Sequence, residues 1–202
     1  MACGNSEERS SQSDKSRGYL IYLHGAIVQQ QGPEAVSEQF GPYLYQTILD
    51  SLTNKGFQVI SEVRPKDAEI GSYAVKVQRQ VRELIEKGAK PSEITILGAS
   101  MGAYIALEAS LLLDNPEIRY VTLGLCGESG INYFLKSKNK FKGKFLSIYE
   151  LSDSRGSCAP LFENNLGASF SEVAINTGLD HGFLFRPLDE WVEPIITWRL
   201  NN

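Results

Sequence analysis

The segment "ITILGASMGAYIAL" (residues 94–107) is the most informative part of this chain about its architecture. Its first half is apolar and β-branched, as in a buried strand, and its second half is alanine-rich with helical periodicity. Gly98 and Gly102 flank Ser100 at the junction. A turn that leads directly from strand to helix forces its corner residue toward positive φ, which costs roughly 1–3 kcal/mol for a residue other than glycine. The pattern therefore predicts a serine held in the open at a sharp turn.

This turn indicates a catalytic nucleophile. It projects the hydroxyl of Ser100 above a helix N-terminus, where backbone N–H groups favour a developing negative charge. A structural alternative is that Ser100 is an ordinary helix N-cap. A dinucleotide-binding G-x-G-x-x-G turn also joins strand to helix, but it requires glycine at position 100.

The rest of the chain alternates strand and helix patterns. We expect strands over residues 18–25, 57–63, 93–97, 119–125, 144–151 and 172–176. We expect helices over residues 43–55, 73–85, 101–113 and 189–200, with two short helices flanking the 144–151 strand and a loop after residue 25. This order predicts an α/β fold of about six mostly parallel strands with helices on both faces. In such sheets the functional groups gather beyond the carboxyl ends of the strands.

The composition of the chain argues against nucleic acid as a partner and against a membrane-spanning segment. The chain has 202 residues and a net charge of −4, so one domain over 18–202 is expected, with no basic field for nucleic acid. No run of 18 apolar residues predicts a transmembrane segment. Residues 1–17 are serine-rich and predict a disordered tail.

The three cysteines are relevant to the cellular compartment in which the protein is located. The residues around Cys3, "ACGN", resemble the cleavage point of a bacterial lipoprotein, without the apolar segment that precedes such a site. The alternative is an ordinary polar tail. A cytoplasmic location, or a bacterial envelope location if Cys3 carries lipid, follows from these two interpretations. Cys126 and Cys158 both follow strands at one end of the sheet, so they are either a disulfide or two separately buried thiols.

A serine nucleophile needs a base, and the chain has two histidines. His181 lies between the last strand and the last helix and is the better candidate. His24 ends the first strand and is expected to orient its loop by hydrogen bonds. The base in turn needs a carboxylate to fix its tautomer. Asp153, just beyond a strand end, is preferred over Glu150 within the strand and over Asp180 beside the histidine.

The strand–"GASMG"–helix segment, followed by Asp153 and then His181, resembles the α/β-hydrolase fold family, whose catalytic order is serine, acid, histidine. The segments "HGAIVQQQG", "ISEVRP" and "HGFLFRPLDEWVEP" look like those of compact bacterial members. The resemblance implies an oxyanion hole formed by the backbone N–H groups of Ala26 and Met101, and no metal or organic cofactor. The usual first hairpin is missing, and the stretch 126–143 is too short for a large lid, so the site should be open to water.

The resemblance implies a serine hydrolase that cleaves a carboxylic ester or thioester of a small or medium acyl substrate through an acyl-enzyme on Ser100. A peptidase would use the same machinery. The alternative function is a catalytically silent binding protein, possibly tethered to the envelope.

Three further features receive structural interpretations. Arg64 and Lys66 follow an edge strand and are expected at a solvated rim, where they could also attract an acidic substrate. Residues 127–130, "GESG", imitate the serine turn with the wrong spacing and predict a turn at the pocket rim. Trp191 and Trp198 are seven residues apart, so they share one helix face and are expected in the core.

Overall fold

A computed structural model of the chain describes residues 17–136, 140–163, 165 and 167–201. The predicted tail, apart from residue 17, lies outside the described residues, and so does Cys3.

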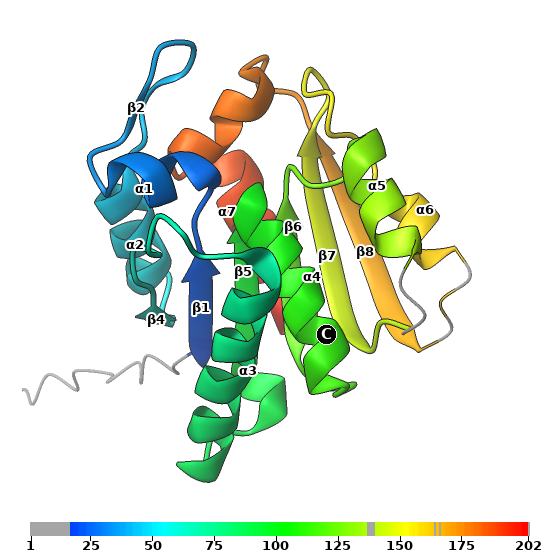
Figure 1. The fold of residues 1–202 in the computed structure, drawn as a ribbon. Helices are drawn as coiled ribbons and strands as arrows, with labels where there is room; N and C mark the ends of the chain where they lie inside the picture. Colours follow the sequence, from blue (N-terminus) through cyan, green and yellow to red (C-terminus); the bar gives the residue numbers. More distant parts are fainter. Residues whose placement is uncertain (1–16, 137–139, 164, 166, 202) are drawn as a thin grey trace, which may run out of the picture.

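The centre of the molecule is a six-stranded sheet in which every neighbouring pair is parallel. The strands, in spatial order, are β4 (Gln58–Ile60), β1 (Tyr19–Leu23), β5 (Ile94–Ala99), β6 (Arg119–Leu123), β7 (Gly143–Glu150) and β8 (Ala168–Ile175). Figure 1 shows this order across the sheet, with β4 at one edge and β8 at the other. The predicted α/β architecture is confirmed, including the edge position of β4.

The two edge strands differ in length from the prediction. β4 ends at Ile60, and the residues that follow make hydrogen bonds that involve side chains. Ser61 Oγ donates to the Tyr22 carbonyl, and Arg64 N donates to His24 Nε2. β8 begins four residues earlier than predicted, at Ala168, where serines on the half-exposed edge give little apolar signal.

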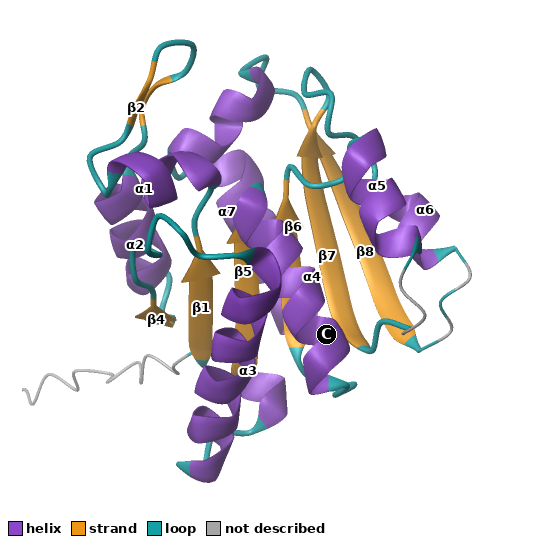
Figure 2. Ribbon diagram, in the orientation of Figure 1, coloured by secondary structure: helices purple, strands orange, loops and turns teal. Residues whose placement is uncertain are grey.

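Seven α-helices and two 3₁₀ helices surround the sheet in the described part of the chain (Figure 2). They are α1 (Ala26–Gln31), α2 (Tyr45–Asn54), α3 (Ile70–Glu86), α4 (Met101–Leu113), α5 (Glu128–Leu135), α6 (Ala159–Phe162), α7 (Asp189–Asn201), η1 (Pro91–Glu93) and η2 (Asp180–Phe185).

Two loop predictions were wrong. The residues after position 25 form helix α1, which is too short to show periodicity in sequence. The "GESG" segment is not a rim turn: Gly127 is the N-cap of α5, and the helix continues through residue 130. A small antiparallel hairpin, β2 (Val36–Ser37) with β3 (Gly41–Pro42), was not predicted.

Apolar side chains on the two faces of the sheet form two separate cores. Leu97 of β5 belongs to the core that includes α2 and α7, whereas its neighbour Ile96 belongs to the core that includes α3 and α4. In Figure 1, α3 and α4 lie in front of the sheet and α7 behind it. Trp191 and Trp198 are buried in the α7 core, as their spacing predicts. Within the described residues, no helix has the length and apolar character needed to cross a bilayer.

Candidate active site

Ser100 occupies the turn between β5 and α4 and has φ 52° and ψ −116°. This left-handed conformation is costly for a side chain, and the surrounding backbone is packed closely enough to hold it. A Cβ on Gly98 would lie 2.3 Å from the Gly102 carbonyl oxygen, and a Cβ on Gly102 would lie 1.9 Å from the Leu23 carbonyl oxygen. Both positions therefore require glycine, because any side chain would push α4 away from β5 or from the end of β1.

The structure brings two further side chains to this serine: Asp153 from the loop after β7 and His181 from η2. His181 Nε2 lies 2.9 Å from Ser100 Oγ, and His181 Nδ1 lies 2.5 Å from Asp153 Oδ2. An ionised carboxylate can only accept, so Nδ1 carries the proton and Nε2 presents its lone pair to the serine hydroxyl. The three side chains thus form one hydrogen-bonded chain ordered for removal of the serine proton.

Asp153 is held as a carboxylate. Its side chain is fully buried, and its second oxygen, Oδ1, accepts from the backbone N of Arg155 at 3.1 Å and from the Arg155 guanidinium at 3.2 Å. Burial would raise the pKa of Asp153, but the hydrogen bond and charge of His181 and the contacts with Arg155 outweigh it, leaving the pKa below its usual value. The carboxylate is therefore available to stabilise an imidazolium on His181.

The two other candidate acids do not reach the His181 ring through any hydrogen bond in the structure. Asp180 Oδ1 accepts from the backbone N of His181 at 2.7 Å and so fixes the main chain beside the ring. Glu150 instead accepts from Thr177 N at 2.8 Å, from Thr177 Oγ1 at 2.5 Å, and from Ser152.

Glu150 joins the loop that carries the acid to the loop that carries the base. Its partner Ser152 lies beside Asp153, and Ser152 Oγ accepts from Asp180 N at 3.0 Å. Burial would raise the pKa of Glu150, but the hydrogen bonds from Thr177 and Ser152 lower it overall. From sequence, Glu150 is considered only as an alternative to Asp153. Its contacts with Thr177 depend on the ends of β7 and β8 lying side by side, which no sequence pattern indicates.

The loop after β1 lies directly beside the serine. A Cβ on Gly25 would lie 3.7 Å from Ser100 Cβ and 3.8 Å from the Ala99 carbonyl oxygen. Ala26 and Met101, the two predicted oxyanion-hole residues, are the first residues of α1 and α4. Backbone N–H groups in the first turn of a helix have no acceptor within that helix. Both groups are thus suited to bind an anion next to Ser100 Oγ.

His24 is fully buried and neutral. Its Nδ1 lies 2.8 Å from the Gly25 carbonyl oxygen, and its Nε2 accepts from Arg64 N at 3.0 Å. Burial, followed by the nearby Arg64 charge, lowers the pKa of His24 to about 4. These contacts agree with a residue that orients its loop.

The expectation that Arg64 lies at a solvated rim is wrong. Its side chain is only 2% exposed and turns inward beneath the β1–α1 loop, where its guanidinium bonds to His24, Gly25 and Gln29. Lys66 is exposed. No sequence pattern shows whether a single arginine at the end of a short edge strand is buried or exposed.

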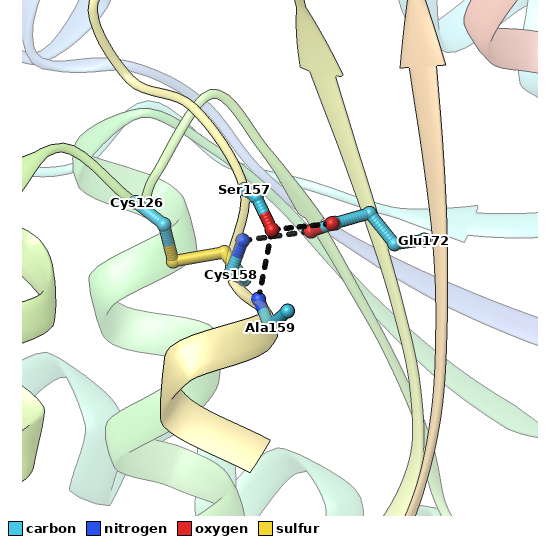
Figure 3. The surroundings of a disulfide bond; sticks show 5 residues. All are labelled: Cys126, Ser157, Cys158, Ala159 and Glu172. Atoms are coloured by element: carbon cyan, nitrogen blue, oxygen red, sulfur yellow. Dashed lines mark hydrogen bonds between the residues drawn. A yellow bond between two sulfur atoms is a disulfide. The ribbon is translucent and has the colours of Figure 1, made fainter. Parts of the chain in front are cut away.

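Cys126 and Cys158 form a disulfide, which settles the alternative that the sequence left open. Figure 3 shows how the neighbouring residues anchor the bridge: Glu172 of β8 accepts from Ser157 Oγ at 2.6 Å and from Cys158 N at 2.7 Å. A Cβ on Gly127, the residue after Cys126, would lie 3.5 Å from the Ser154 carbonyl oxygen. The bridge thus ties the loop after β6 to the loop that contains Asp153.

Comparison with known proteins shows which solved structures have a similar fold. No family model matches the sequence, and no curated protein matches it. Among solved structures, the chain is similar to a putative hydrolase of the α/β superfamily from Xanthomonas campestris, with 13% identity, a TM-score of 0.52, and coverage of 93% of this chain and 100% of that one.

Two further similar structures have names that state an activity. One is RedJ, a thioesterase from the prodiginine biosynthetic pathway in Streptomyces coelicolor, with 12% identity, a TM-score of 0.57, and coverage of 90% of this chain and 85% of that one. The other is a mutant of the esterase E40, with 14% identity, a TM-score of 0.59, and coverage of 93% and 76%. The chain therefore has the α/β-hydrolase fold.

Proposed function

We propose that the protein is a serine hydrolase that cleaves a carboxylic ester or thioester through an acyl-enzyme on Ser100. The observation that carries this proposal is the hydrogen-bonded chain from Ser100 through His181 to Asp153. Asp153 follows Ser100 by 53 residues and precedes His181 by 28 residues, and the three side chains meet at the same end of the sheet. A strained serine within reach of an oriented imidazole is the arrangement that nucleophilic catalysis needs.

The reaction follows from the positions of the protons. Ser100 Oγ attacks the acyl carbonyl while its proton moves to His181 Nε2, and the carbonyl π electrons become an oxyanion. The N–H groups of Ala26 and Met101 hold this oxyanion. Collapse of the tetrahedral species expels the alkoxide or thiolate, which takes the proton from His181. Water then repeats both steps and releases the acid.

The surroundings of the site favour small or medium acyl substrates. Within the described residues, the only regular element between β6 and β7 is α5, which has eight residues. Ser100 itself is partly exposed. With so little chain above the serine, few side chains are available to enclose a long acyl group.

The fold comparisons support the reaction class. The similar structures include an esterase and a thioesterase, and the same machinery serves both reactions because the leaving group is an alkoxide in one and a thiolate in the other.

The test of the proposal is covalent labelling. Ser100 Oγ attacks the phosphorus of a fluorophosphonate and displaces fluoride, and peptide mass mapping locates the stable phosphonate ester that forms. We expect labelling of folded protein at Ser100, and none in Ser100→Ala or in heat-unfolded protein. Folded protein that is not labelled at Ser100 would contradict the proposal.

A matched panel of chromogenic esters and thioesters with the same acyl chains then separates the two reactions. We expect turnover that is lost by at least about 10³-fold in Ser100→Ala. Labelling without turnover of any member of the panel would favour a binding protein instead.

A further inference from the structure

Arg64 is a buried cation without a carboxylate partner. Its side chain is 2% exposed, and none of the ion pairs among the described residues includes it. The nearby carboxylate of Glu62 pairs with Lys76 and accepts from Tyr73 Oη instead. Burying a charged group costs free energy of desolvation, which hydrogen bonds or a nearby opposite charge must offset. The contacts of Arg64 show what it serves.

The guanidinium of Arg64 bonds mainly to the backbone of the β1–α1 loop. Its Nη2 donates to the His24 carbonyl at 2.5 Å and, at 3.4 Å, to the Gly25 carbonyl. Its Nε donates to Gln29 Oε1 of α1 at 2.9 Å. The guanidinium carbon lies 5.6 Å from the centre of the Tyr73 ring. Arg64 is thus held between the loop, the first helix and an aromatic ring.

The Gly25 carbonyl has a second and shorter donor. His24 Nδ1 donates to it at 2.8 Å, and His24 Nε2 accepts from the backbone N of Arg64 at 3.0 Å. Because Nε2 accepts from an N–H group, the ring proton must be on Nδ1. The backbone of Arg64 therefore fixes the tautomer of His24, while its side chain and His24 together anchor the carbonyl of Gly25.

Anchoring this carbonyl fixes the N–H group of Ala26. The C=O of Gly25 and the N–H of Ala26 belong to one planar trans peptide, so they point in opposite directions and turn together. When two donors hold the oxygen on the buried side, the N–H is directed to the other side, where Ser100 lies beside Gly25.

We infer that Arg64 is a positioning residue for the oxyanion hole, holding the Gly25–Ala26 peptide in the orientation that binds the oxyanion. The inference rests on the proposed function, because it assigns Arg64 to the same reaction. The charge of Arg64 contributes as well: it is uncompensated by a carboxylate and lies in a low-dielectric setting, which favours negative charge developing on the far side of the peptide.

Arg119 provides a matched control. It is also an arginine buried to a similar degree (7% exposed), and it also donates to a backbone carbonyl, that of Ser92. It is the first residue of β6, however, and so lies at the opposite end of the sheet from Ser100. Arg64→Met and Arg119→Met each remove one buried guanidinium and keep an apolar stem of similar length.

The kinetic test measures kcat and KM for one activated ester. We expect Arg64→Met to lower kcat by about 10–100-fold with KM within about 2-fold, because a misdirected donor costs somewhat less than the 10²–10³-fold loss of a whole donor. Arg119→Met should keep kcat within about 2-fold of the wild type.

A binding test gives a readout independent of turnover. Ser100 Oγ adds to the carbonyl carbon of an alkyl trifluoromethyl ketone while the serine proton passes to His181, which leaves a hemiketal oxyanion; the matching alcohol has no carbonyl and cannot form this adduct. We expect Arg64→Met to weaken inhibition by the ketone about 10-fold or more and to leave inhibition by the alcohol unchanged.

Arg64→Lys covers the case in which Arg64→Met does not fold. It keeps the cation but has a single head group that cannot reproduce the guanidinium fork. We expect a loss of ketone affinity of about 3–10-fold relative to Arg119→Lys, at a comparable midpoint of urea unfolding.

Each outcome decides between the two proposals. Wild-type kcat and ketone affinity in both Arg64 variants would overturn the role of Arg64 alone. Wild-type protein that neither turns over the ester nor forms the ketone adduct would overturn the serine hydrolase proposal and this inference with it.

Discussion

Three carboxylates bind the segments that carry Asp153 and His181, and each accepts from a different group. Asp153 accepts from the ring, Asp180 accepts from the backbone N of the same residue, and Glu150 ties the two loops together. Similar chemistry at neighbouring positions thus performs different tasks, which are distinguished only by the donor that each oxygen faces. Substitutions that keep shape and remove charge separate these tasks.

We expect Asp153→Asn to lower kcat for an ester by about 10³–10⁴-fold, because the amide no longer fixes the tautomer with the proton on Nδ1 or stabilises the imidazolium. Asp180→Asn is the matched control. Its side-chain oxygen can still accept from His181 N, so kcat should fall less than about 10-fold. Steady-state kinetics on both variants checks the assignment, and a larger loss in Asp180→Asn would contradict it.

His24 should make the stability of the protein depend on pH. Burial and the Arg64 charge lower its folded pKa to about 4, whereas an unfolded histidine has a pKa of about 6.5. The unfolded state therefore binds more protons between these values. The contribution of His24 to stability is fully present above pH 6.5 and is lost as pH falls toward 4, by about 3 kcal/mol.

Urea unfolding at several pH values between 4 and 7 measures this loss. His24→Asn removes the titrating group, so its free energy of unfolding should fall less steeply than that of the wild type over the same window. Parallel pH profiles for the two proteins would contradict the expected neutral state of His24.

At the scale of elements, the sequence predicted what local patterns determine. The helix over residues 101–113 matches α4 at both ends because a strained turn defines its start, and the long apolar runs marked the strands of the sheet. Helix α1 and the β2–β3 hairpin were missed because they are too short for periodicity and are held by tertiary contacts. The inward turn of Arg64 and the bracing by Glu150 likewise depend on elements distant in sequence.

The contact between α4 and the end of β1 leads to a prediction about Gly102. We expect Gly102→Ala to lower the free energy of unfolding by about 3 kcal/mol or more, because its Cβ would lie 1.9 Å from the Leu23 carbonyl oxygen. Gly71 in α3 is the control, since a Cβ there meets nothing within 4 Å. Gly71→Ala should raise stability by about 0.5–1 kcal/mol in the same urea titration. Equal effects of the two substitutions would contradict the close packing.

At the scale of the whole molecule, the two cores share one set of strands. Alternate residues of β5 face the α7 core and the α3–α4 core, so neither core can lose its strands without exposing the other. Cooperative loss of both cores is therefore expected.

The two tryptophans allow this to be tested. Trp191 and Trp198 both lie in α7, on one face of the sheet, so their fluorescence reports one core, whereas far-ultraviolet circular dichroism reports all helices and strands. We expect the two urea transitions to coincide in midpoint and slope. A fluorescence transition at lower urea would show that the α7 face unfolds separately.

The bridge between Cys126 and Cys158 makes the redox history of a preparation part of its catalytic behaviour. A glutathione-buffered cytosol keeps thiols reduced, so protein made there would lack the covalent link between the loop after β6 and the loop that contains Asp153. Specific activity should accordingly rise with the fraction of chains oxidised, and titration of free thiols alongside each assay would reveal that proportionality.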